Sequence, residues 1–150
     1  MTCDYKPAPQ NASDEQGGER IVLDRFVISF NIAKESEMYV ALTFTNAGAT
    51  AISEARIAYL AIDDDAGHNY LRRPLPQVDF RKLAPSQSFT FSDHFYCGAF
   101  LPGHYKLHLW VPSPDQSLKF DNRHNLLLAS EGVPDPSTGL NVLGDFKRER

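Results

Sequence analysis

Four side chains that can recognise a ligand recur at every second position in the second half of the chain. They are two histidines, a lysine and the single tryptophan: His104, Lys106, His108 and Trp110. Residues two apart in a strand share one face, so these four form a row while Tyr105, Leu107, Leu109 and Val111 face the core. Because an indole ring stacks on the C–H face of a sugar and polar neighbours bind hydroxyls, the row is a candidate glycan-binding face. The alternative is that Trp110 packs beneath the loop that follows it, or against another domain.

The spacing of His104 and His108 resembles a pair of metal ligands, but only on a helix. On a strand, residues four apart lie about 13 Å from each other, too far to share an ion whose bonds to nitrogen are about 2 Å long. Asp63, Asp65 and Gly67 begin like a calcium loop, yet His68 and Pro74 stand where an EF-hand needs Gly and Glu. We therefore expect a solvated turn at residues 63–69 and no metal or other cofactor.

Motifs for covalent or phosphate chemistry are absent from the sequence. Cys97 lies three residues after His94, a spacing that does not define a nucleophile and its base. Cys3 and Cys97 are the two cysteines; one long-range disulfide is conceivable, and two unpaired thiols are favoured. No G-x-S-x-G, H-E-x-x-H, phosphate loop or G-x-G-x-x-G occurs. We expect a non-catalytic protein, with a small hydrolase or metal enzyme as the less favoured alternative.

The elements that position these residues are predicted to be short strands. Apolar residues alternate within residues 21–33, 38–45, 55–63, 88–92 and 105–111, and a further apolar run covers 125–130. Residues 70–87 contain three prolines and are expected to form a long connection or an edge element. Residues 132–146 are expected to close the domain as turn-rich chain. About seven strands without a helical period predict an all-β, immunoglobulin-like β-sandwich, with a small barrel as the alternative.

The chain has 150 residues, a length that predicts one domain, and its net charge is −4. Residues 1–20 are polar and contain Pro and Gly, so we expect a disordered tail or linker there and the sandwich over 21–150. The acidic balance argues against a nucleic-acid partner. No apolar run approaches the roughly 20 residues that span a bilayer, and the first residues do not form a signal peptide, so we expect no membrane insertion.

The second half resembles the end of an uncharacterised bacterial family of domains of unknown function. The matches are a Pro-Gly-x-Tyr strand, a loop rich in proline and aspartate, a D-x-R segment and a final Thr-Gly-x-Asn-x-Leu-Gly. The matching residues are Pro102, Gly103, Tyr105, Pro112, Pro114, Asp115, Asp121, Arg123, Leu128, Ala129, Thr138, Gly139, Asn141, Leu143 and Gly144. Residues 42–62 are similar to an earlier strand–turn–strand segment, so the resemblance covers residues 21–146.

In that family this portion is expected to form a C-terminal sandwich behind a barrel similar to glycoside hydrolases. The resemblance therefore implies an accessory β-sandwich of a carbohydrate-active or cell-surface protein, in an extracellular or cell-surface location. We expect weak glycan binding through Trp110, His108, Lys106 and His104. The alternative from another class is a structural or protein-interaction module that docks an adjacent domain.

Overall fold

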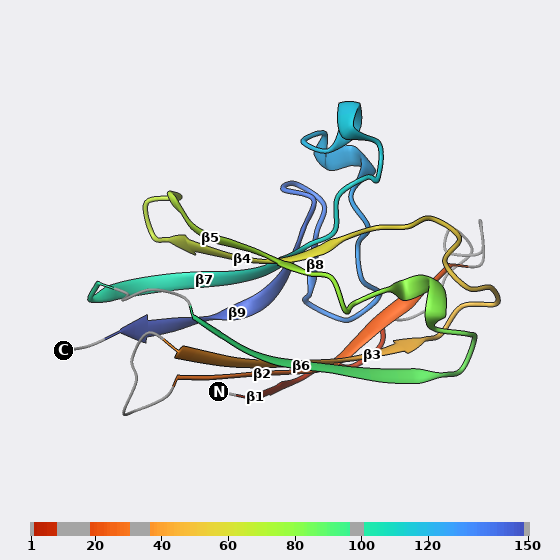
Figure 1. Cartoon of the computed structure of the whole chain (residues 1–150), viewed down its shortest axis with the longest axis horizontal. Helices are drawn as coiled ribbons and strands as arrows, with labels where there is room; N and C mark the ends of the chain where they lie inside the picture. The colour runs from red at the N-terminus through yellow and green to blue at the C-terminus, as the bar shows by residue number, and fades with distance from the viewer. Residues whose placement is uncertain (1, 9–18, 31–36, 97–100, 149–150) are drawn as a thin grey trace.

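The computed structural model describes residues 2–8, 19–30, 37–96 and 101–148, and these residues form two antiparallel sheets packed face to face. Figure 1 shows the two layers one above the other. Strand β1 begins and strand β9 ends on the same side of the molecule. No α-helix occurs in these four segments. None of their helical turns is long and apolar enough to cross a membrane. The predicted all-β sandwich is confirmed.

Nine strands make up the two sheets in the described part of the chain. They are β1 (Thr2–Asp4), β2 (Ile21–Phe30), β3 (Glu37–Asn46), β4 (Ala58–Asp64), β5 (Asn69–Leu75), β6 (Ser88–Tyr96), β7 (Gly103–Trp110), β8 (Pro134–Asp135) and β9 (Leu140–Arg148). One sheet has the order β1-β2-β3-β6 and the other the order β5-β4-β7-β9-β8. Three short 3₁₀ turns lie between strands: Phe80–Lys82, Gln116–Leu118 and Asn122–His124.

Alternating apolar residues explain the core of the four-stranded sheet. In β3 the inward residues Met38, Val40, Leu42 and Phe44 are all fully buried, as the two-residue period predicts. Their strand pairs with β2 on one side and with β6 on the other. Phe80, in a 3₁₀ turn, places its ring edge-on against Phe44 with ring centroids 5.1 Å apart.

The five-stranded sheet contributes its inner face through β7 and β4. Tyr105, Leu107, Leu109 and Val111 are buried, which confirms the predicted orientation of this strand. The expected connection or edge element proves to be an edge strand, β5, which carries Pro74. An edge position suits proline because one side of the strand needs no backbone donor.

The strand count was predicted too low because residues 132–146 were interpreted as turns. They contain β8 and most of β9, which pairs with β7 along nearly its whole length. Gly139, with a left-handed φ of 73°, forms the turn before β9. Gly144 lies within β9 opposite Leu107, next to a register shift in the pairing.

The strand predicted over residues 125–130 is absent, and this prediction was wrong. The segment follows the turn Asn122–His124 as irregular chain and makes one isolated bridge, Ser130 with Pro7. Its backbone is instead satisfied by scattered partners: Leu126 N–H donates to Val111 O at 2.8 Å, and Ala129 N–H donates to Ile21 O at 2.7 Å. Leu126 and Leu128 therefore pack against the core without joining a ladder.

The first eight residues also depart from prediction, because part of the expected tail belongs to the sheet. Strand β1 pairs with β2, with Cys3 opposite Phe26. Tyr5 packs against the core and its hydroxyl donates to the carbonyl of Leu143 in the opposite sheet. Residues 9–18 of the predicted tail lie outside the described residues.

Candidate functional site

The predicted row on β7 lies on the outer face of the five-stranded sheet. Pairing with β4 sets Trp110 opposite Tyr59, His108 opposite Ala61 and Lys106 opposite Asp63. The row is divided among three environments: an aromatic cluster at Trp110, a half-buried polar cluster at His108, and the exposed end of the strand at Lys106 and His104. The structure therefore does not bring the four predicted residues together into one site.

Trp110 is packed rather than open. This agrees with the alternative that it lies beneath the loop that follows it in the sequence. Its ring lies 4.8 Å from the Tyr59 ring at an interplanar angle of 35°, and 5.8 Å from the Phe120 ring at 29°. Only 9% of the residue remains exposed, whereas Phe120 is 81% exposed. The open aromatic surface at this place therefore belongs to Phe120, which the sequence analysis did not identify.

Lys119 completes the aromatic cluster. Its ammonium lies 5.0 Å from the ring centroid of Tyr59, 5.7 Å from that of Trp110 and 5.8 Å from that of Phe120. Such distances are those of cation–π contacts. The Lys119 Nζ also donates to the Tyr59 hydroxyl at 3.2 Å. Tyr59, Trp110, Lys119 and Phe120 are called the aromatic cluster below.

Aspartate caps shape the loop that carries Lys119 and Phe120. Asp115 accepts from Ser117 N–H at 2.9 Å, and Asp121 accepts from Arg123 N–H at 3.1 Å. The Arg123 guanidinium also binds both oxygens of Asp121, and these hydrogen bonds lower the pKa of that carboxyl to about 2. Figure 1 shows this loop standing out from the five-stranded sheet.

Two further contacts hold the loop against the sandwich. Arg56 donates to the carbonyls of Pro112 and His124 at 3.1 and 2.9 Å. A Cβ added at residue 139 would come within 2.6 Å of the Asn122 carbonyl oxygen, so Gly139 is required for the loop to lie on the β8–β9 turn. Phe120 is thus presented by a loop that is fixed at several points.

A pocket of about 400 Å³ opens beside the aromatic cluster, on the outer face of the sheet. Its wall combines two aromatic rings with short hydrogen-bonding side chains and one arginine: Asn69, Arg72, Trp110, Phe120, Asn122, Ser137, Thr138 and Leu140. Of the predicted site residues only Trp110 lines it. The other members come from the edge strand β5, the loop between β7 and β8, the β8–β9 turn and the first residue of β9, and no local spacing in the sequence links them.

A half-buried polar cluster lies next to this pocket. Arg72 Nη2 contacts Asp63 Oδ1 at 2.9 Å and donates to Asn69 Oδ1 at 2.6 Å. His108 Nδ1 lies 3.8 Å from Asp63 Oδ2, and the His108 side chain is only 14% exposed. Burial lowers the pKa of His108. The nearby cations Arg72 and Lys106 lower it as well, whereas the Asp63 carboxylate acts to raise it. His108 is therefore a neutral imidazole at pH 7.

The far end of the row holds a different arrangement around His104. Its Nδ1 lies 2.9 Å from Asp65 Oδ1, and its Nε2 lies 2.8 Å from Asp145 Oδ2. This histidine ties the β4–β5 turn to β9, while Lys106 stays exposed. Asp63 and Asp65 each contact a basic side chain, and the described residues contain no group of three His, Cys, Asp or Glu that could hold a metal ion.

His94 and Cys97 were considered as a nucleophile and its base. The His94 ring lies against the Tyr39 ring, with centroids 4.8 Å apart and planes inclined by 44°, on the other sheet from the pocket. Cys97 lies outside the described residues, and Cys3 carries a free thiol.

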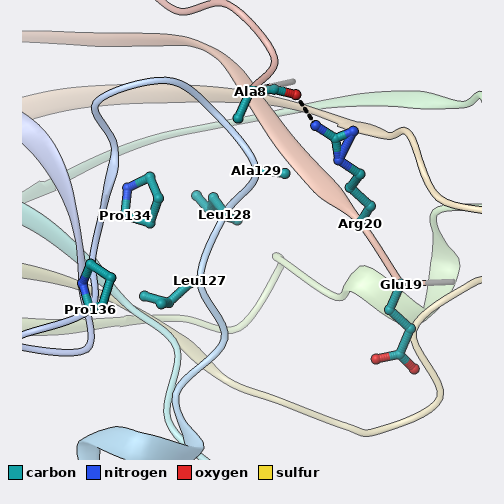
Figure 2. A pocket seen from close by; sticks show the side chains of 8 residues that line it. All are labelled: Ala8, Glu19, Arg20, Leu127, Leu128, Ala129, Pro134 and Pro136. Carbon is teal, nitrogen blue, oxygen red and sulfur yellow. Dashed lines mark hydrogen bonds between the residues drawn. The ribbon is translucent and has the colours of Figure 1, made fainter. Parts of the chain in front are cut away.

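A second pocket, of about 290 Å³, lies between the N-terminal segment and residues 127–136 (Figure 2). Prolines, leucines and alanines make up most of its wall. In Figure 2 the Arg20 guanidinium turns away from the prolines and donates to the Ala8 carbonyl. Because Arg20 is engaged in this way and residues 9–18, which connect Ala8 to Glu19 in the sequence, are outside the described residues, we assign no ligand site there.

Comparison with known proteins adds little to this geometry. No family model matches the chain, and no curated protein matches it. Among solved structures, the chain is similar to a Bordetella pertussis protein assigned as ApaA, with 14% sequence identity and a TM-score of 0.41. The similarity covers 64% of this chain and 81% of that one. The resemblance to an uncharacterised bacterial family stays a prediction.

Proposed function

We propose that this protein is a non-catalytic carbohydrate-binding β-sandwich that binds a sugar chain in the pocket beside the aromatic cluster. The observation that carries the proposal is the composition of this pocket. An exposed phenylalanine stands next to two asparagines, a serine, a threonine and an arginine. Sugar sites need both an apolar ring surface and several directed hydrogen-bonding groups, and this wall offers both.

Phe120 is the stacking platform in this proposal. Its ring is supported on one side by Trp110 and presents the rest of its surface to solvent. A pyranose that stacks on Phe120 can reach the Asn122 side chain, which makes no hydrogen bond to another described residue. Ser137 and Thr138, in the β8–β9 turn, extend the polar part of the same wall. Trp110 acts as the support beneath the platform.

The strand order favours an immunoglobulin-like module, a finer assignment that is also part of the proposal. The strand orders β2-β3-β6 and β5-β4-β7-β9 correspond to the orders A-B-E and C′-C-F-G in the two sheets of that fold. The resemblance to the bacterial family agrees with an accessory domain of a carbohydrate-active or cell-surface protein. Substrate cleavage would then belong to another domain, as non-catalytic modules act by binding alone.

A glycan array with three proteins tests the proposal. The wild type is expected to bind at least one class of glycan, and Phe120→Ala is expected to lose that binding because the stacking surface is gone. Phe89→Ala is the matched control, since Phe89 is 41% exposed on the other sheet. The single Trp110 gives a solution readout, because a sugar on Phe120 changes its surroundings. Equal binding by wild type and Phe120→Ala, or binding to no glycan, would contradict the proposal.

The alternative is a protein-interaction module, and one observation favours it. Strand β6 is at the edge of the four-stranded sheet, is nine residues long and carries the exposed residues Phe89 and Tyr96. Long edge strands pair readily with another chain. Sedimentation of the purified protein separates the two functions: a dimer abolished by Phe89→Pro, together with a blank glycan array, favours the interaction module.

A further inference from the structure

The charge of the pocket wall is opposite to that of the whole chain. The protein has a net charge of −4, yet the only charged residue lining the pocket among the described residues is Arg72, and no carboxylate lines it. A second cation, Lys119, lies against two of the lining rings, Trp110 and Phe120. Arg72 is paired with Asp63, so Lys119, at the edge of the pocket, is the cation to consider as a partner for a ligand.

Lys119 differs from other basic groups in this region because its partners are aromatic. Arg72 contacts Asp63, and Arg123 contacts Asp121 at 2.7 Å. Within the described segments Lys119 forms no ion pair with a carboxylate; its ammonium is held by the Tyr59 hydroxyl and three ring faces. A lysine ammonium has three donors on a flexible stem, so donors remain for a ligand.

Acidic side chains near the loop are already engaged within the protein. Asp121 receives three hydrogen bonds from Arg123, and Asp115 and Asp135 each accept from a serine two residues later. Asp63 contacts Arg72 and faces His108. These carboxylates thus have partners of their own, and Lys119 is left for a negative charge from outside.

We propose that the ligand of this pocket is an acidic glycan, whose carboxylate or sulfate binds the Lys119 ammonium while one of its sugar rings stacks on Phe120. This inference rests on the proposed sugar binding and specifies its substrate class. A charge-assisted hydrogen bond to an anion is stronger than the cation–π contacts it would replace or share. The Lys119 ammonium lies 5.8 Å from the centroid of the Phe120 ring, so a single pyranose can contact both groups.

Paired glycans that share a backbone, one member with its anionic groups and the other with these groups esterified or removed, test the inference. One pair is hexamers of α-1,4-linked galacturonate with free or methyl-esterified carboxylates; the other is carrageenan hexamers, sulfated or desulfated. The galacturonate pair reports a carboxylate and the carrageenan pair a sulfate, both titrated by Trp110 fluorescence and by array binding. We expect one charged member to bind more tightly than its neutral partner by roughly tenfold, the effect of one charged hydrogen bond.

Variants assign this preference to Lys119. Lys119→Gln should remove the roughly tenfold preference, Lys119→Arg should retain most of it, and Lys82→Gln, an exposed lysine outside the pocket, should leave it unchanged. Added salt should weaken the charged pair member more than the neutral one. Neutral glycans bound as well as acidic ones would overturn this inference and leave the proposed function standing. Binding to no glycan at all would overturn both.

Discussion

The ring of Phe120 lies on the indole of Trp110, with centroids 5.8 Å apart and planes inclined by 29°. One residue of this pair is almost buried and the other almost fully exposed. The contact divides two tasks between neighbouring aromatic side chains. Trp110 packs between the loop and the sheet, and in the proposed function the free surface of Phe120 is the one that contacts a ligand.

This division predicts opposite effects of two alanine substitutions. Trp110→Ala should lower the free energy of unfolding by about 3–5 kcal/mol, the usual loss for a buried aromatic. Phe120→Ala should change it by no more than about 0.5 kcal/mol, because an exposed side chain loses little area. Urea unfolding followed by circular dichroism measures both. Similar losses for the two variants would show that Phe120 is packed like Trp110.

Trp110 emission gives an independent check on the same pair. A buried indole should emit at shorter wavelength than free tryptophan, and Phe120→Ala should shift the emission of Trp110 to longer wavelength as water reaches its outer face. Phe89→Ala is the control, since Phe89 is on the other sheet. Unchanged emission in Phe120→Ala would contradict the stacked arrangement.

Asn141 is a fully buried amide that organises the irregular segment after the loop. Its Nδ2 donates to the carbonyls of Leu109 and Leu126 at 3.2 and 3.0 Å, and its Oδ1 accepts from Leu128 N–H at 2.7 Å. Asn141→Leu removes the side-chain partner of each of these three backbone groups. We expect a loss of about 2–4 kcal/mol in the free energy of unfolding, since each orphaned buried group costs about 1–3 kcal/mol. A loss below about 1 kcal/mol would show that water replaces the amide.

The same residue explains why the sequence predicted β3 and β7 well and residues 125–130 badly. Alternation is a local signal, and it correctly assigned the buried faces of both strands. A run of three leucines, 126–128, resembles a buried strand, but a strand also needs a neighbouring ladder. Here the partner is a side chain thirteen or more residues away, and no local pattern records that.

The candidate site was less predictable than the fold for a related reason. Trp110 was identified because it belongs to a periodic strand, whereas Phe120 lies in a loop where periodicity has no meaning. Proximity of Asn69, Asn122 and Thr138 depends on which strands pair, and that is decided by long-range contacts. The one local signal was a phenylalanine in a mostly polar loop, and an exposed aromatic in such a place is worth testing for function.

From the contacts of Tyr5 we predict that the first eight residues contribute to stability. Its side chain packs against the core, its backbone N–H donates to Asp24 O at 2.9 Å, and its hydroxyl reaches the opposite sheet. Tyr5→Ala should cost about 2–3 kcal/mol, and Tyr5→Phe about 1 kcal/mol for the hydrogen bond alone. Lys6→Ala, at an exposed position, is the control. Thermal unfolding of the variants measures the effect; no loss in Tyr5→Ala would restore the view of residues 1–20 as a loose tail.

His108 predicts a specific dependence of stability on pH. Burial holds the pKa of His108 below its ordinary value in the folded state, whereas the unfolded chain has a pKa of about 6.5. Above that pH both states are neutral and His108 adds no pH dependence. As the pH falls below about 6.5, the unfolded state binds a proton that the folded state resists, so folding stability decreases until the folded pKa is passed.

His108→Gln isolates this contribution, because the other titrating groups are common to both proteins. Urea titrations from pH 7.5 to pH 5 measure the free energy of unfolding of both proteins. The value for the wild type minus the value for the variant should decrease steadily as the pH falls. Burial, Arg72 and Lys106 oppose protonation of His108, whereas Asp63, 3.8 Å away, and Asp135 favour it. A difference that instead moves toward the wild type at low pH would mean that the Asp63 carboxylate, not burial, controls this histidine.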